Sequence, residues 1–251
     1  MGFIQRFFGG DDSDGKNKTQ PPPLPDFDYE LIYVPGNVAV QNAIALREKW
    51  HDASTPVILG TQENFDRLTD IWDEDSPSPS EYLESAANLD LEKWFADHAS
   101  EDQEDSELQD YINKASDWNT HSGAAEEFTV VREVLSRKIH PWVLIAKIPT
   151  PHPYEVPAYL RLGGWNECPD APVHVALWKK WQHQYGAEIL CVTGDIIEAT
   201  VARPPTEKEE CYKLAREQYL YCSDIVTQGV GTIDALASTL RAGKSWYFWW
   251  D

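Results

Sequence analysis

Apolar runs separated by turn-forming residues predict alternating strands and helices along the first part of the chain. ELIYVPG (30–36) is a short β-type run closed by a Pro-Gly turn, and TPVILG (55–60) is an apolar run bounded by proline and glycine. Between them, Asn37 can cap a helix that runs to about Trp50. NFDRLTDIW (64–72) has apolar residues at helical spacing. This β-α-β-α order favours a mixed or parallel sheet.

The rest of the chain also predicts alternating strands and helices, and its capping and turn motifs are more frequent. A helix is expected over AAEEFTVVREVLSR (124–137), and PWVLIAKIP (141–149) is a strand. Asp170 can cap an aromatic helix, and residues 187–205 give two strands joined by a tight Gly194-Asp195 turn. T-E-K-E (206–209) has the capping-box pattern and should open the next helix. TIDALASTLRAG (232–243) predicts a last helix that ends at its glycine.

The chain ends in SWYFWWD (245–251), which reads as a buried last strand. In a strand, Trp246, Phe248 and Trp250 share one face, while Tyr247 and Trp249 take the other. Aromatic residues on both faces imply covering structure on each side. The alternative is an aromatic-walled groove in which an indole N–H points at a ligand.

These elements predict an α/β or α+β fold with a mixed β-sheet flanked by helices. Residues 1–27 are polar and proline-rich and are expected to be a flexible tail. Residues 28–140 form a variable, acidic N-terminal α/β region, and residues 141–251 a compact C-terminal domain. No apolar run is long enough for a membrane-spanning helix.

Charge narrows the classes of partner. The formal net charge is −21, with 42 acidic and 21 basic residues, and thirteen acidic residues but only Lys93 as a base lie between residues 73 and 107. Such a surface repels phosphate backbones, so we expect no nucleic-acid partner. A basic protein is the partner that the charge favours, although acidity also serves solubility alone. The cysteines form no C-x-x-C pair and no cleavable signal peptide precedes them, which predicts free thiols in the cytoplasm.

Recognisable catalytic motifs are missing from the sequence. It contains no G-x-S-x-G, G-x-x-x-x-G-K-[ST] or G-x-G-x-x-G stretch, so we expect no cofactor. The His and Cys spacings match no standard zinc pattern, so no metal ligands are predicted, and a Cys168–His174 nucleophile pair is a weak alternative. Polar and aromatic residues inside apolar motifs are the candidates for binding, or else for structural networks. These candidates are Trp165, Asn166, Glu198, Arg203, Glu217, Gln218, Asp224 and Trp250.

Five stretches occur together in the last part of the chain: LGGWNECP, YGAE, ARPP, AREQYLYCSDIVTQG and WYFWWD. In this order they resemble the bacterial family catalogued as domain of unknown function 4253, over roughly residues 141–251. Ser223 stands where that pattern usually has a proline. The resemblance implies a fold unit and carries no catalytic residues.

Three hypotheses of function remain open. The first is a non-enzymatic binding protein for a protein partner, for example an immunity-type protein that neutralises a basic toxin. The second is a hydrolase whose carboxylates lie near the Gly163–Cys168 loop. The third is a structural or assembly role.

Overall fold

The computed structural model describes residues 20–70, 72, 75–102, 106–115, 118 and 128–251. Within these residues one six-stranded sheet has the strand order β1-β3-β2-β4-β5-β6. Its strands are β1 (Glu30–Val34), β2 (Thr55–Gly60), β3 (Val143–Ile148), β4 (Ala187–Val192), β5 (Ile196–Val201) and β6 (Ser245–Trp249). The neighbours β2 and β4 are parallel, and every other pair of neighbours is antiparallel. The expected mixed sheet is therefore confirmed.

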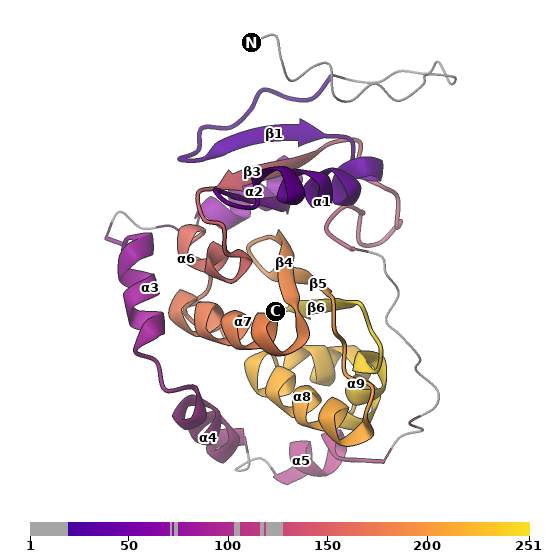
Figure 1. Cartoon of the computed structure of the whole chain (residues 1–251). Coiled ribbons are helices and arrows are strands. Elements are labelled where there is room, and N and C mark those ends of the chain that lie inside the picture. Colours follow the sequence, from indigo (N-terminus) through magenta and orange to yellow (C-terminus); the bar gives the residue numbers. More distant parts are fainter. Residues whose placement is uncertain (1–19, 71, 73–74, 103–105, 116–117, 119–127) are drawn as a thin grey trace.

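Helices surround this sheet (Figure 1). In the N-terminal part they are α1 (Ala39–Trp50), α2 (Gln62–Asp70), α3 (Pro79–Ala87), α4 (Leu91–Asp102) and α5 (Ser106–Ile112). In the C-terminal part they are α6 (Val156–Tyr159), α7 (Ala171–Tyr185), α8 (Lys208–Tyr221) and α9 (Ile233–Leu240). A π-helical turn, Ile225–Val230, lies between α8 and α9. No helix in the described ranges combines the length and apolar character needed to cross a bilayer.

The two faces of the sheet are buried by different elements. On one face Ala39 and Ala43 of α1 pack against Ile58, Ile145 and Leu190. On the other face α7, α8 and α9 cover the alternate strand residues in the larger core cluster. Because both faces are covered, every residue of β2 is buried. The continuous apolar pattern of TPVILG reflects this double burial.

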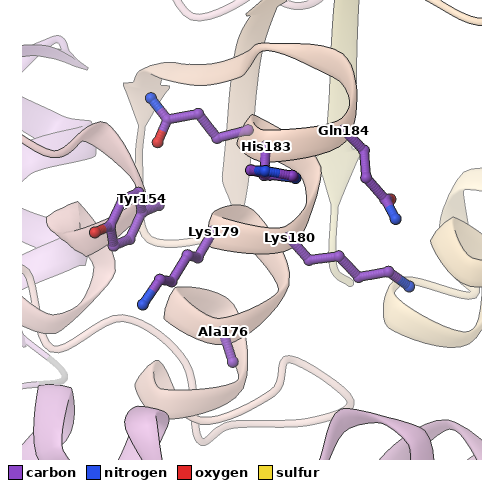
Figure 2. Close-up of a pocket in the computed structure, with 7 residues that line it drawn as sticks. Tyr154, Ala176, Lys179, Lys180, His183 and Gln184 are labelled. Atoms are coloured by element: carbon purple, nitrogen blue, oxygen red, sulfur yellow. The ribbon is translucent and has the colours of Figure 1, made fainter.

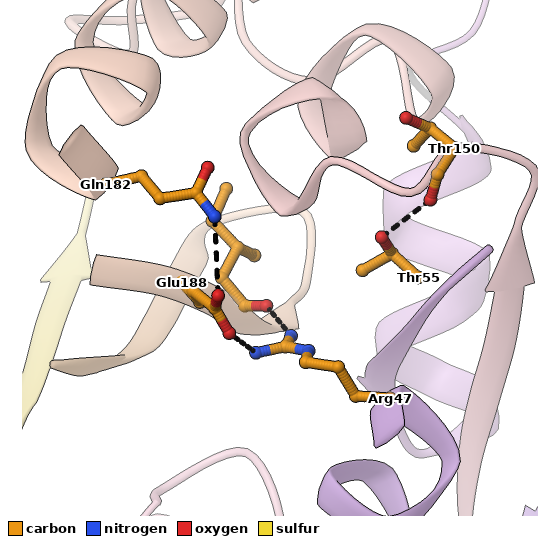
Figure 3. A network of polar contacts seen from close by, with 6 residues as sticks. Arg47, Thr55, Thr150, Gln182 and Glu188 are labelled. Carbon is orange, nitrogen blue, oxygen red and sulfur yellow. Dashed lines mark hydrogen bonds and ion pairs between the residues drawn. The ribbon is translucent and has the colours of Figure 1, made fainter. Parts of the chain in front are cut away.

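Polar contacts also join the first part of the chain to the last (Figure 3). Arg47 of α1 donates to Glu188 Oε2 of β4 at 2.8 Å and to the carbonyl oxygen of Ile189. The other carboxylate oxygen of Glu188 accepts from Gln182 of α7 at 3.3 Å. Thr55 Oγ1 at the start of β2 donates to the Thr150 carbonyl at 2.7 Å. These bonds fix α1 and β2 against the elements that follow residue 141.

The terminal strand β6 lies at the edge of the sheet and packs one face inward. Trp246 and Phe248 are buried, as is Trp250 just after the strand. Phe248 stacks on Trp181 of α7, with 5.7 Å between ring centroids. The expected covering of both faces is wrong for the second face, because Tyr247 is 42% exposed there, although Trp249 is partly buried.

Four further local predictions differ from the structure. Asn37 does not cap α1, because it lies inside the 3-10 turn Gly36–Val38 and Val38 is the N-cap. Residues 124–127 lie outside the described residues, and 128–137 form turns with an isolated Arg132–Ile139 bridge rather than a helix. The capping box at 206–209 does not form, since Glu207 is the N-cap of α8 and makes no side-chain cap bond. Asp170 does occupy the N-cap of α7, but its side chain caps no amide.

The division at residue 141 remains a prediction, and the sheet crosses it. Strand β2 comes from before residue 141 and lies between β3 and β4, which come after it. Residues 20–27 have no helix or strand, yet Phe27 packs edge-on against Phe65 with ring centroids 5.0 Å apart.

Candidate functional site

The glycine-rich loop before α7 is held in a tight, specific conformation. Gly163 and Gly164 have φ values of +98° and +79°, and a Cβ on Gly163 would lie 1.7 Å from the Pro169 carbonyl oxygen. Only glycine fits there. Across the loop, Gly164 N donates to Cys168 O at 3.1 Å and Cys168 N donates to Trp165 O at 2.9 Å. The loop is thus a closed turn that places Asn166 at its tip.

Beneath this loop runs a buried chain of polar side chains. Cys168 Sγ lies 3.5 Å from His174 Nε2, and His174 Nδ1 lies 2.5 Å from the Tyr221 hydroxyl. The Tyr221 oxygen also accepts from Trp178 Nε1 at 3.0 Å. A cavity of about 520 Å³ lies beside the loop. Its lining includes Asn166, Cys168 and Tyr221, together with Trp94 and His98 of α4.

The hydrogen bonds assign the tautomer of His174. Its Nδ1 lies against the Tyr221 hydroxyl, so we assign the ring N–H that bonds the Pro169 carbonyl to the other nitrogen, Nε2. Nδ1 then accepts from the Tyr221 hydroxyl. Complete burial lowers the pKa of His174 to about 3, so the imidazole is neutral at physiological pH.

This arrangement does not make Cys168 a nucleophile. Burial raises the pKa of its thiol far above the ordinary value, which keeps the sulfur protonated. The nearest base position, His174 Nε2, already holds a proton and cannot take the one on the thiol. The Cys168–His174 pair therefore belongs to a structural network.

Three of the expected binding residues meet at the carboxyl end of the chain. Asn166 Nδ2 donates to the main-chain oxygen of Asp251 at 2.7 Å, and the Asp251 amide donates to Asp224 Oδ2 at 3.0 Å. The Trp250 ring lies edge-on to His174 and Tyr221, with centroids 5.5 and 5.3 Å apart. Asn166, Asp224 and Trp250 together clamp the last residues over the buried polar chain.

The other expected residues lie apart from this clamp. Glu198 is buried on β5, where its carboxylate accepts from the amides of Thr129 at 2.5 Å and Val130 at 3.1 Å. Burial raises the pKa of Glu198, and these hydrogen bonds partly offset that effect. Arg203 donates to the His183 carbonyl at 2.8 Å and so caps the end of α7.

Glu217 accepts from Trp181 Nε1 at 3.2 Å and pairs with Lys180 at 2.8 Å. Within the described part of the chain, Gln218 Nε2 and the indole nitrogens of Trp165 and Trp250 are buried without a hydrogen-bond partner. No three His, Cys, Asp or Glu side chains converge to hold a metal ion among the residues that the structure describes. The expected set is thus dispersed over several elements.

A shallow depression lies on the outer side of α7 (Figure 2). Lys179, Lys180 and His183 project from that helix, and Tyr154 forms its edge. Lys180 is already paired with Glu217, so this depression offers less free charge than its composition indicates.

Sequence reasoning did not find the role of Tyr221. The tyrosine lies on α8, and its partners His174 and Trp178 lie on α7. The spacing of residues along either helix cannot reveal a bond between the two helices.

The C-terminal part of the chain supplies four strands of the mixed sheet and the helices α6 to α9. Residues 144–251 match the family described as Domain of unknown function (DUF4253), which confirms the expected resemblance of this part of the chain to that family. No curated protein and no solved structure matches the chain. The match starts within β3, so the central strand β2 is supplied from outside the matched region.

Proposed function

We propose that this chain is a non-enzymatic binding protein that takes a basic protein on the surface formed by α3, α4 and α5. The observation that carries the proposal is the orientation of the charges on these helices. Among the residues whose exposure is described, seven carboxylates of this surface are exposed, six on these helices and Asp90 just before α4: Glu81, Glu84, Asp90, Glu92, Asp97, Glu107 and Asp110. We call this set the acidic surface.

The same three helices are attached to the core by their apolar sides. Trp94 and Phe95 of α4 and Leu108 of α5 pack against the main cluster, while Ala86 of α3 packs against Ala158 and Val175. Figure 1 shows α3, α4 and α5 following one another around the outside of α6, α7 and α8. The carboxylates are therefore fixed on a folded surface.

Charge of this kind acts mainly on association. A field from fixed carboxylates attracts a cationic partner over about one Debye length, which is about 8 Å at physiological salt. It raises the association rate and makes binding sensitive to salt. Lys93, the base within this segment, is bonded to Asp97 at 2.6 Å and leaves the surface strongly negative. An immunity-type role, in which the partner is a cationic toxin, is one form of this proposal.

The hydrolase alternative has less support. It would use Glu198, Glu217 or Asp224 near the Gly163–Cys168 loop, but each of these carboxylates is hydrogen-bonded within a different part of the fold. An acid and a base for hydrolysis must both reach one reacting bond.

The test is an affinity capture from native extract at low and high salt, with two matched variants. Glu84→Lys/Glu92→Lys changes the acidic surface, and Glu48→Lys/Asp52→Lys changes exposed carboxylates at the end of α1 by the same charge. We expect a stoichiometric basic protein that is lost at high salt and from the first variant, but retained by the second. Equal retention by both variants, or no retained basic protein with the unaltered chain, contradicts the proposal.

A further inference from the structure

A second, separate cavity lies where the parallel strands β2 and β4 end. Both strands point their carboxyl ends at the same edge of the sheet, and their chains then diverge, β2 into α2 and β4 through a tight turn into β5. Ligands in open α/β sheets commonly bind in the crevice at such a divergence. The cavity there has a volume of about 410 Å³, within the range of small-molecule sites.

The walls of this cavity come from separate segments. Thr61 and Asn64 follow β2, Thr193 follows β4, and Tyr247 projects from β6. The remaining wall is the segment 129–140, which folds back on itself through the Arg132–Ile139 bridge. We call residues 132–139 the rim hairpin.

The charge of the lining is opposite to that of the chain. The cavity is lined by three arginines, Arg67, Arg132 and Arg137. Two acidic residues, Glu63 and Glu133, also belong to the lining. The whole chain carries a formal charge of −21, so this concentration of arginine is unusual within it. Guanidinium groups present planar forks of N–H donors that match carboxylate and phosphate oxygens.

Two of these arginines come from different walls of the cavity, Arg67 from α2 and Arg137 from the rim hairpin. The Arg67–Glu63 ion pair of 2.7 Å is solvent-exposed, with side chains 64% and 74% accessible, and exposed pairs of this kind contribute little free energy. Arg137 lies close enough to Tyr247 for its charge to favour the ionised form of that phenol, although burial dominates and raises the pKa of Tyr247. Arg67 and Arg137 therefore offer cationic groups from two separate walls.

The rim of the cavity is apolar and open. Val134 and Leu135 at the tip of the rim hairpin are 77% and 94% exposed, and Tyr247 is 42% exposed. The tip is held by Glu133 N bonding Lys138 O at 2.8 Å and Arg137 N bonding Glu133 O at 2.9 Å. A rigid turn thus keeps two aliphatic side chains in water beside a cationic cavity, where an apolar ligand body would cover them.

The base of the rim hairpin is fixed from below. The buried carboxylate of Glu198 accepts from the Thr129 amide, the Thr129 hydroxyl at 2.9 Å and the Val130 amide. These bonds anchor the hairpin on β5, so the cavity exists before any ligand arrives. A preformed site loses less conformational entropy on binding.

We propose that this cavity binds an organic anion, in which a carboxylate or phosphate group is attached to an apolar body. The anionic group lies between Arg67 and Arg137, and the apolar body lies against Val134, Leu135 and Tyr247. This site is independent of the acidic surface, which carries charge of the opposite sign on other helices.

The test is a titration of the full chain with the fluorescent aromatic anion 8-anilinonaphthalene-1-sulfonate. We expect saturable binding at one site, weakened at least tenfold by Arg67→Gln/Arg137→Gln. The control is Lys213→Gln/Arg216→Gln, which removes two exposed cations from α8 and should change the affinity less than twofold. Near-UV circular dichroism checks that each variant is folded, because this dye also binds partly unfolded chains.

Competition then identifies the anionic group. Displacement of the dye by octanoate identifies a carboxylate site, and displacement by octyl phosphate a phosphate site. Displacement by neutral octanol at the same concentration overturns the proposed anion recognition. Dye binding that is absent, or equal in both double variants, overturns the site itself.

Discussion

Tyr221→Phe tests the buried polar chain most directly, because it removes a single oxygen and leaves the ring in place. That oxygen donates to His174 Nδ1 at 2.5 Å and accepts from Trp178 Nε1 at 3.0 Å. All three side chains are buried, so water cannot replace the hydroxyl without rearrangement. The variant therefore leaves one acceptor and one donor unsatisfied.

The expected loss of stability follows from those two groups. A buried polar group left without its partner costs about 1–3 kcal/mol, so two such groups give a loss of about 2–6 kcal/mol. This is a large share of the about 5–15 kcal/mol by which a typical domain is stable. The ring contacts of Tyr221 with Phe248 and Trp250 persist, so little of the loss comes from packing.

The assay is urea unfolding of both chains at pH 7.5, followed by tryptophan fluorescence and far-UV circular dichroism. We expect a lower midpoint with an unchanged m-value, because the surface exposed on unfolding is the same. Tyr111→Phe is the control, since that side chain is 47% exposed and its variant should stay within about 0.5 kcal/mol of the unaltered chain. A Tyr221→Phe variant that also stays within this margin refutes the reasoning.

Three other measurements probe the same fold. Since the pKa of His174 falls from 6.5 in the unfolded chain to about 3 on folding, stability should drop as pH falls below 6.5, by about 2 kcal/mol at pH 5. In urea unfolding at pH 7 and pH 5, His174→Gln should not show this loss. An equal loss of stability between the two pH values in both chains would contradict the low pKa of His174. All four thiols are buried, and burial raises the pKa of Cys222 to about 12, so a disulfide reagent at pH 8 should react with them only after unfolding. Rapid labelling of native Cys168 would restore the nucleophile hypothesis. The fragment 141–251 should show no cooperative unfolding, because it lacks the strand β2 that lies between β3 and β4; a sharp transition would establish it as an independent domain.

Local patterns predicted most of the regular elements. The apolar run TPVILG became β2, and the helix carrying Trp178 and Trp181 became α7. The Gly194-Asp195 turn closes the β4–β5 hairpin through the bond from Thr193 N to Ile196 O at 2.9 Å. In each case the signal comes from residues a few positions apart, whose spacing determines which side chains share a face.

The helix predicted over 124–137 shows where local patterns fail. In the described residues 128–137, the amides of Thr129 and Val130 bond the carboxylate of Glu198, and Arg132 pairs with Ile139. A buried acceptor about seventy positions away in the chain thus takes amides that a helix would have used. Val134 and Leu135, which lie within the predicted helix, are exposed at the tip of the rim hairpin instead.

Sequence patterns were enough to predict the fold class, the family resemblance of the last part of the chain, the acidity and the aromatic terminal strand. The roles of the expected site residues became visible only in the folded chain. Folding brought Asn166, Asp224 and Trp250 together at the last residue and left Glu198, Arg203 and Glu217 in separate networks. It also gathered Arg67 and Arg137, seventy positions apart, around one cavity. Periodicity reports only which neighbours along the chain share a face, whereas hydrogen bonds and cavities depend on segments that meet when the sheet closes.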